Sequence, residues 1–238
     1  MANHEILDNK NHKDIKVITQ FDKTYSDNNN SALIFPTEMK DAQRDYPILF
    51  IKNRETGQFQ SVVLLGLEPN ENLYINNGWQ ASYIPAMINK GPFIIGFEEK
   101  EEHGKTVKNP IIAIDTDSPR VNKDSGEPVF LENGEPSPYL LQVNNALKTL
   151  HEGSQLSKQM FDAYLKNDLI EPVALNIELQ NGEKLSLEGN YTLNEEKLAN
   201  LKGEALEALH ASGLLRVAYF ITASLSNIQR LVDLKNSQ

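Results

Sequence analysis

The sequence lacks cysteine altogether and has only five histidines in 238 residues. The absence of cysteine excludes disulfides, zinc–thiolate sites and thiol nucleophiles, and it leaves the cellular compartment open. The histidines, His4, His12, His103, His151 and His210, are scattered, so a metal enzyme would have to gather its ligands from distant segments. We therefore expect no metal site and no cofactor.

The common catalytic motifs are also missing. The chain has no G-x-G-x-x-G, no P-loop, no G-x-S-x-G elbow and no S-x-x-K. His151 and Glu152 begin like a zinc-protease motif, but the second histidine is absent. These absences argue against the commonest nucleotide enzymes and hydrolases, while enzymes as a class stay open.

The chain has little apolar sequence of the length that membranes and secretory leaders require. Residues 1–16 are polar and of mixed charge, without the apolar core of a secretory signal. The most apolar late stretch, residues 213–225, contains Arg216 and is too short to cross a bilayer. We expect no membrane insertion and a cytoplasmic location, with leaderless export to the cell surface remaining open.

Basic residues are outnumbered, because 33 acidic residues face 23 lysines and arginines and give a formal net charge of −10. An acidic surface repels nucleic acid phosphates and anionic lipids, and no run of lysine or arginine offsets this charge. The expected partner is therefore a protein, peptide or glycan and not a nucleic acid. Assembly of identical copies also stays open.

Domain organisation follows from composition. Residues 1–31 are rich in asparagine, aspartate and lysine, which predicts a flexible N-terminal arm, although Val17 and Ile18 could dock as a short strand. Residues 32–238 are predicted to form one domain, long enough to bury roughly 70% of its unfolded surface. A boundary within the proline-rich loop 117–138 is the alternative, but no Gly/Ser linker separates the halves.

The first half of the chain is predicted to be rich in β-strands. Thr37 can cap a short helix that runs to about Arg44. Residues 47–52 and 58–67 read as a hairpin, and residues 93–97 and 111–115 as buried strands joined by a charged loop. Pro85 suits the first turn of a helix over residues 82–89.

The second half is predicted to be mainly helical, with one hairpin. Apolar residues recur at helical spacing over residues 140–150 and 156–164, with Gly153 as an interruption. Residues 173–180 alternate apolar and polar, and Asn181-Gly182 is the strongest short hairpin signal. Asn194 should cap a helix, and two more should cover residues 204–211 and 213–234. The fold class is α+β, with antiparallel strands first and a helical layer after them.

Aromatic residues concentrate around the only tryptophan, Trp79. Together with Tyr74, Tyr83 and Phe93 it could line a groove for a peptide or a sugar, with Asn72 as a polar neighbour. The alternative is that the same rings pack together as a hydrophobic cluster in the core. The two interpretations differ in whether the rings face solvent.

A second candidate site is the pair Asp115 and Asp117, which would share one face at a strand end. Two carboxylates at this spacing could bind a hard cation or act as an acid and a base, with Arg120 gripping an anion. The alternative is a strand end in which the aspartates accept hydrogen bonds from backbone amides and Arg120 forms a structural ion pair.

A series of short segments carries a family resemblance through its order along the chain. The segments are Tyr46-Pro47-Ile48-Leu49-Phe50, Leu64-Leu65-Gly66-Leu67, Asn72-Leu73-Tyr74, Gly78-Trp79, Tyr83-Ile84-Pro85-Ala86, Gly91-Pro92-Phe93, Ile114-Asp115-Thr116-Asp117-Ser118-Pro119 and Gly126-Glu127-Pro128-Val129-Phe130. With later matches, residues 32 to 234 resemble the SapC family of bacterial proteins. The resemblance implies an association with a bacterial surface layer, and it brings no catalytic residue with it.

The leading functional hypothesis is a non-catalytic binding or accessory protein that presents the aromatic groove. The alternatives are an enzyme that uses Asp115, Asp117 and Arg120, and a structural component of a surface layer. An enzyme predicts that these three side chains converge at a pocket. A binding protein predicts exposed aromatic rings.

Overall fold

The computed structural model describes residues 3–22, 25, 28–102 and 105–237. The chain forms two compact units, each assembled from two separate segments. Unit 1 comprises residues 1–21 and 86–151, and unit 2 comprises residues 22–85 and 152–238. This division differs from the predicted boundary at residue 31, because the chain passes between the units three times.

Unit 1 contains two three-stranded antiparallel sheets and helix α2 (Ala86–Asn89). The first sheet has the order β1-β7-β6, with β1 His4–Ile6, β7 Lys105–Asp115 and β6 Phe93–Glu102. The second has the order β8-β2-β9, with β8 Val121–Asn122, β2 Lys16–Val17 and β9 Glu127–Pro128. Strands β6 and β7 are longer than predicted, because they continue pairing through the charged segment that was expected to be a loop.

The predicted flexible arm is ordered over much of its described length. Strand β1 pairs with β7, and β2 pairs with both β8 and β9. Ile15 and Val17 are buried, which explains why this polar segment docks. Residues 1–2, 23–24 and 26–27 of the predicted arm lie outside the described residues.

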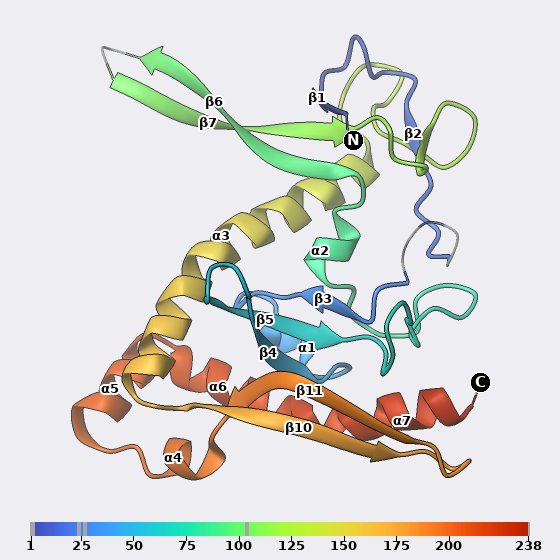
Figure 1. The fold of residues 1–238 in the computed structure, drawn as a ribbon. Helices are drawn as coiled ribbons and strands as arrows, with labels where there is room; N and C mark the ends of the chain where they lie inside the picture. Colours follow the sequence, from blue (N-terminus) through green and yellow to red (C-terminus); the bar gives the residue numbers. More distant parts are fainter. Residues whose placement is uncertain (1–2, 23–24, 26–27, 103–104, 238) are drawn as a thin grey trace. The chain divides into compact units, whose positions relative to one another are not determined.

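Unit 2 is built on a five-stranded antiparallel sheet of order β10-β11-β4-β5-β3 (Figure 1). Its strands are β10 Ile170–Glu178, β11 Lys184–Leu193, β4 Ile48–Lys52, β5 Phe59–Leu64 and β3 Ser31–Leu33. Both predicted hairpins are present, and the Asn181-Gly182 hairpin joins the earlier strands through pairing of β11 with β4. The predicted α+β class is confirmed.

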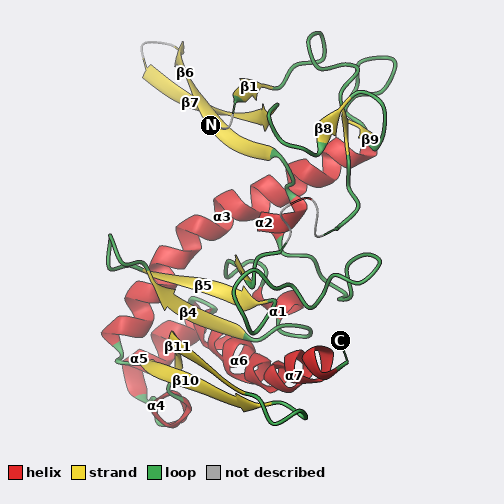
Figure 2. Cartoon of the chain, turned by 45° about the vertical axis from the view of Figure 1, so that its right-hand side comes forward, coloured by secondary structure: helices red, strands yellow, loops and turns green. Residues whose placement is uncertain are grey.

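Helices lie on both faces of this sheet. On one face, Phe161 of α3 (Pro138–Lys166) contacts Phe50 and Phe59, with ring centroids 5.1 and 5.9 Å away. On the other, α6 (Leu214–Ser224) packs against β4 and β11, and α7 (Ile228–Asn236) follows it (Figure 2). The shorter helices of unit 2 are α1 Met39–Ala42, α4 Glu195–Ala199 and α5 Gly203–Ala211. Asn194 caps α4 as predicted, by accepting the Lys197 N–H.

The long helix α3 runs without interruption through Gly153, contrary to the prediction. A Cβ atom at Gly153 would lie 2.4 Å from the Cβ of Phe35 and 2.7 Å from Oγ1 of Thr37. The glycine therefore permits close packing of α3 against the segment before α1. Its role is steric, which a helical periodicity cannot reveal.

The predicted C-terminal helix is broken into α6, a 3-10 turn (Leu225–Asn227) and α7. Ser224, at the break, is buried, donates its hydroxyl to Ile221 O at 2.6 Å and accepts the N–H of Ile48 at 2.9 Å. Among the described helices, no single one is long and apolar enough to span a membrane. Residues 203–211 and 214–236 pass that test only as a pair bent by 88°.

We predict that Gly153→Ala lowers the free energy of unfolding by about 1–3 kcal/mol, because the new methyl group overpacks the contact with Phe35. An unobstructed helical glycine would instead gain about 0.5–1 kcal/mol on this change. Urea denaturation measures the sign directly, with Gln159→Ala on the exposed side of α3 as the control. A more stable Gly153→Ala protein would contradict the close packing.

Candidate functional site: the Trp79 turn

Residues 72–83, the Trp79 turn, lie between β5 and α2 in unit 2 and contain four of the predicted site residues. The turn is closed by backbone hydrogen bonds from Gln80 N–H to Tyr74 O (2.8 Å) and from Asn76 N–H to Gly78 O (3.0 Å). Asn77 and Gly78 have φ values of 48° and 113°, which reverse the chain at the tip. The turn therefore has a defined backbone despite its irregular structure.

The start of the turn is anchored below the surface. Asn72 is buried, and its Oδ1 accepts the Tyr74 N–H at 3.0 Å. The preceding loop approaches itself so closely that a Cβ at Gly66 would lie 2.3 Å from Glu71 O. The Glu71 carboxylate accepts the N–H groups of Leu67 (2.9 Å) and Glu68 (3.3 Å). Asn72 is thus a structural residue that sets the path of the turn.

The aromatic rings are divided between the core and the surface. Tyr74 is fully buried against Tyr46, with ring centroids 4.7 Å apart. Trp79 stacks over Tyr74 at 6.3 Å and 16°, and both Trp79 and Tyr83 are only half-buried. Of the predicted aromatic rings in the turn, only those of Trp79 and Tyr83 therefore reach the surface.

A chain of hydrogen bonds fixes these two side chains. Trp79 Nε1–H donates to the Tyr46 hydroxyl at 2.7 Å, and that hydroxyl donates to Tyr83 O. The Tyr83 hydroxyl donates to Oε1 of Glu38, a buried carboxylate, at 2.7 Å. Burial and the neighbouring Glu38 raise the pKa of Tyr83, and burial raises the pKa of Tyr46, so both phenols stay protonated donors.

Asp45 connects the turn to the C-terminal helix. Its carboxylate accepts the backbone N–H of Ser82 at 3.0 Å and the Ser82 hydroxyl, and it pairs with Arg230 Nη1 at 2.6 Å. Burial alone would raise the pKa of Asp45, but the hydrogen bonds from Ser82 and Arg230 outweigh it and hold that pKa below 3.8. Asp45 is therefore ionised and fully bonded at neutral pH.

Helix α7 holds the outer side of residues 68–80, here called the Trp79 loop. Arg230 Nη2 donates to Gln80 O at 3.0 Å, and its guanidinium lies 5.5 Å from the centroid of the Tyr74 ring. One turn further along, Lys235 bonds Glu71 at 2.5 Å and Glu68. The loop is thus clamped at both ends by cations from one helix.

This arrangement favours recognition over chemistry. A half-exposed indole is held in one orientation, and the amide side chains of Asn76, Asn77 and Gln80 are exposed around it. An aromatic plate supplies apolar contact area with few rotamers to freeze, while amides donate and accept hydrogen bonds. Such a surface can bind sugar rings or extended peptide segments.

The other four predicted site residues belong to unit 1, where the structure does not join them into one site. Phe93 is fully buried and packs against Tyr139, with ring centroids 6.1 Å apart. Asp115 accepts the backbone N–H groups of Asn3 (3.1 Å) and Asp117 (3.2 Å), as in the structural alternative. Asp117 itself is exposed. This geometry gives Asp115 a structural role at the strand end.

Arg120 holds the N-terminal segment of unit 1. Its Nη1 donates to Ile18 O at 2.7 Å and to Gln20 O at 3.0 Å, and the guanidinium lies 5.8 Å from the centroid of the Phe21 ring. A small cavity of about 40 Å³ lies beside it, lined also by Tyr139. Its volume is near that of a single water, too small for an organic substrate.

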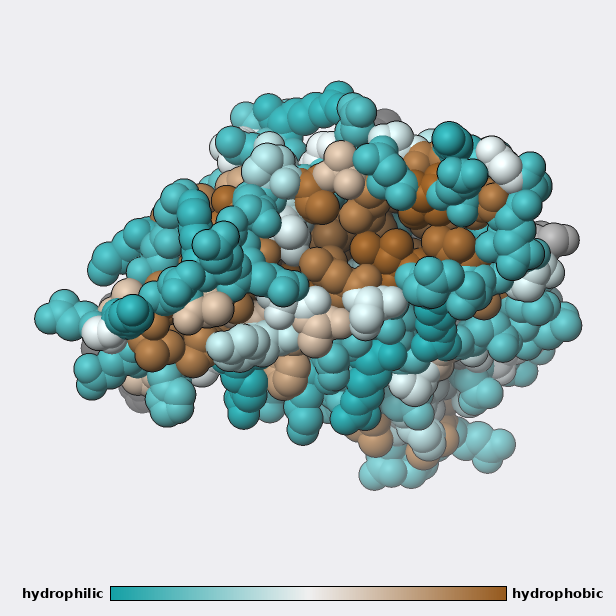
Figure 3. Space-filling view, turned by 90° about the horizontal axis from the view of Figure 1, so that it is seen from below, coloured by the Kyte–Doolittle hydropathy of each residue, from teal (hydrophilic) through white to brown (hydrophobic). Residues whose placement is uncertain are grey.

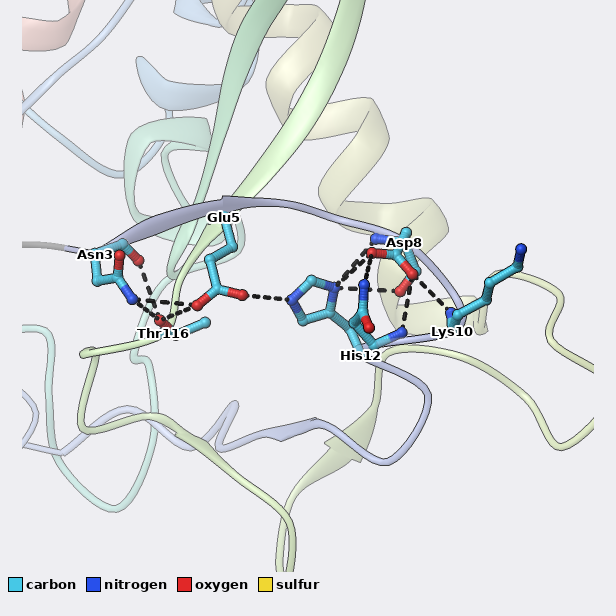
Figure 4. A network of polar contacts seen from close by, with 7 residues as sticks. Asn3, Glu5, Asp8, Lys10, His12 and Thr116 are labelled. Atoms are coloured by element: carbon cyan, nitrogen blue, oxygen red, sulfur yellow. Dashed lines mark hydrogen bonds and ion pairs between the residues drawn. The ribbon is translucent and has the colours of Figure 1, made fainter.

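A polar network in unit 1 holds residues 3–12 in place (Figure 4). His12, buried between two carboxylates, has its Nε2 3.3 Å from Glu5 Oε2, and its Nδ1 accepts the Asp8 N–H at 3.2 Å. Thr116 bonds both Glu5 and Asn3 from the other side. Hydrogen bonds from Asn11 and Lys10 lower the pKa of Asp8 to about 2. Through Thr116, the network connects this segment with the end of β7.

Sequence reasoning did not identify four residues that support the Trp79 turn by hydrogen bonds, namely Glu38, Asp45, Tyr46 and Arg230. They bond across large separations, 185 residues for Asp45 and Arg230, so no local spacing connects them. Within the described residues, no group of three or more His, Asp or Glu side chains is arranged to hold a metal ion. The candidate site therefore consists of aromatic and amide groups supported by buried charges.

The chain matches the family model described as SapC over residues 7–231. No curated protein and no solved structure matches the chain.

We predict that Asp45→Asn lowers the free energy of unfolding at pH 7 by about 2 kcal/mol, because Arg230 and Ser82 lose a charged acceptor. A carboxylate with a depressed pKa stabilises the fold above its unfolded value of 3.8, and this stabilisation is lost as the pH falls through the folded pKa. The variant should therefore lose less stability than the wild type on acidification below pH 4.

Urea denaturation at pH 7, 4 and 3 measures both effects. Asp162→Asn, which removes an exposed carboxylate on α3, is the matched control and should behave like the wild type. Parallel stability profiles for Asp45→Asn and the wild type would show that Asp45 is not the linked group.

Proposed function

We propose that this chain, which belongs to the SapC family, is a non-catalytic binding or accessory protein. It presents the Trp79 turn to a peptide, glycan or partner protein. The observation that carries the proposal is the fixed orientation of a half-exposed indole, whose Nε1–H bonds the buried Tyr46 hydroxyl at 2.7 Å. A preorganised aromatic surface loses little conformational entropy on binding.

The surroundings of Trp79 support this proposal. The supporting shell is made of groups with little freedom, the fully buried rings of Tyr46 and Tyr74 and the ion pair of Asp45 with Arg230. Rigid support of this kind is what a binding surface requires to hold its anchors in place. In unit 1, Asp115 instead accepts the backbone N–H groups of Asn3 and Asp117, so the alternative enzymatic site gains no support from its geometry.

The protein offers a direct readout, since Trp79 is its only tryptophan and the source of all indole emission. Titration of the full chain with a panel of oligosaccharides and extended peptides should yield a ligand class that changes this emission saturably. Calorimetry with that ligand should show at least a tenfold loss of affinity for Trp79→Ala, as expected for an aromatic hot spot.

Two variants serve as controls for this experiment. Phe97→Ala removes an exposed ring on β6 of unit 1 and should bind like the wild type, as should Asp117→Ala. A ligand that Trp79→Ala binds as tightly as the wild type would overturn the proposed surface. Loss of binding in Asp117→Ala alone would favour the carboxylate site instead.

Tyr46→Phe isolates the effect of orientation. It removes the hydroxyl that accepts the Trp79 N–H and donates to Tyr83 O, and it keeps the buried ring. We expect a three- to tenfold weaker affinity with the ring contact intact, corresponding to about 1 kcal/mol. An unchanged affinity, measured in the same calorimetric assay, would mean that the indole does not need this bond to bind.

A further inference from the structure

The β10–β11 hairpin has two different faces. Residues paired across antiparallel strands share a face. Tyr191 lies on the face that contacts α3, because its ring centroid is 5.0 Å from that of Phe59, which in turn stacks on Phe161 of α3. The opposite face carries the pairs Leu175–Leu187 and Ile177–Leu185. A register irregularity between Val173 and Leu175, next to Gly189 with φ of 79°, brings these apolar residues onto one face.

Helix α7 turns an apolar stripe toward this face. Its last residue, Asn236, accepts the Gln180 N–H at 3.0 Å and so anchors the helix end to the hairpin turn. Val232 lies one helical turn before Asn236, and Ile228 and Leu225 precede it on the same side. Leu231, on the adjoining side of the helix, is buried in the core, and Arg230 points away from the stripe, toward the Trp79 loop.

These two apolar surfaces do not fill the space between them. Figure 3 shows a hollow of hydrophobic side chains over this face, surrounded by hydrophilic ones. We define the apolar hollow by residues that are only half-buried on the two elements: Leu175, Leu185, Leu187, Leu225, Ile228 and Val232. Half-buried leucines in a concave surface keep apolar area in contact with water that a partner would cover.

The charges beside the hollow are acidic. Both cations of α7, Arg230 and Lys235, are already paired with carboxylates of the Trp79 loop and its support. On the hairpin and α7, Glu183, Glu188 and Asp233 have no cationic partner within the described part of the chain. Together with the net charge of −10, this field attracts a basic ligand and opposes a second copy of the chain.

We propose that the apolar hollow binds an amphipathic helix of a partner protein whose polar face is basic. A helix fits a groove bordered by a hairpin and another helix, and it would seat side chains at i, i+3, i+4 and i+7 among the leucines. Its lysines or arginines would meet Glu188 and Asp233 at the rim. This second surface shares no lining residue with the Trp79 turn.

The test uses the full chain and three labelled synthetic peptides of eighteen residues. One has leucine on one helical face and lysine on the other, one has glutamate in place of lysine, and one is a scramble of the first. Fluorescence anisotropy should show saturable binding of the leucine–lysine helix, at least tenfold tighter than that of either other peptide. Equal binding of the helix and its scramble would overturn the proposal.

Variants locate the site. Leu187→Ser should weaken binding of the leucine–lysine helix about tenfold, whereas Leu141→Ser, which changes an exposed leucine of α3, should leave it unchanged. In case Leu187→Ser fails to fold, Asp233→Lys alters only the exposed rim and should weaken binding at least threefold. Asp162→Lys on α3 is its control, and an equal effect of both would show non-specific charge attraction and overturn the site.

Two further outcomes separate the occupants. Sedimentation of the free chain should show a monomer, and a dimer dissociated by Asp233→Lys would assign the hollow to a second copy and overturn the proposal. Trp79→Ala should bind the leucine–lysine helix normally. Failure of this helix to bind leaves the result for the Trp79 turn untouched, so the two proposals stand or fall separately.

Discussion

Asp45 is a carboxylate with 6% of its surface exposed, and its charge draws together three segments that are far apart in sequence. Ser82 approaches it from the Trp79 turn, Arg230 from α7, and its own backbone oxygen accepts the Tyr74 hydroxyl at 2.7 Å. A buried charge that lost these partners would cost several kcal/mol. The position of Trp79 therefore depends on an ion pair in which the indole takes no part.

Helix α7 serves two surfaces with opposite properties. Toward the Trp79 loop it offers Arg230, which bonds both Gln80 O and the Asp45 carboxylate and so restrains the loop. Toward the β10–β11 hairpin it offers Ile228 and Val232, which remain partly uncovered. One side is thus closed by charge pairing within the chain, while the other retains apolar area. Successive residues of an α-helix point about 100° apart, so even a short helix can present different side chains to two surfaces.

The features that sequence reasoning predicted are those with local causes. The alternation before Asn181-Gly182 fixed a hairpin, and Asn194 capped α4, because both depend on neighbours within a few residues. Gly153 was misread because its reason is contact with Phe35, over a hundred residues earlier. Trp79 drew attention as a rare aromatic, yet composition could not separate its half-buried indole from the fully buried rings of Tyr74 and Phe93.

The interleaving of the two units imposes an order on folding during synthesis. Unit 2 begins with residues 22–85, but β4 pairs with β11, and the Ile48 N–H is bonded by Ser224, 176 residues later. At roughly 5–20 residues per second, the ribosome needs roughly ten to thirty-five seconds to supply that partner. During this interval strand β4 lacks helix α6, which packs against it in the folded protein. The first segment of unit 2 therefore cannot complete its sheet until most of the chain has been made.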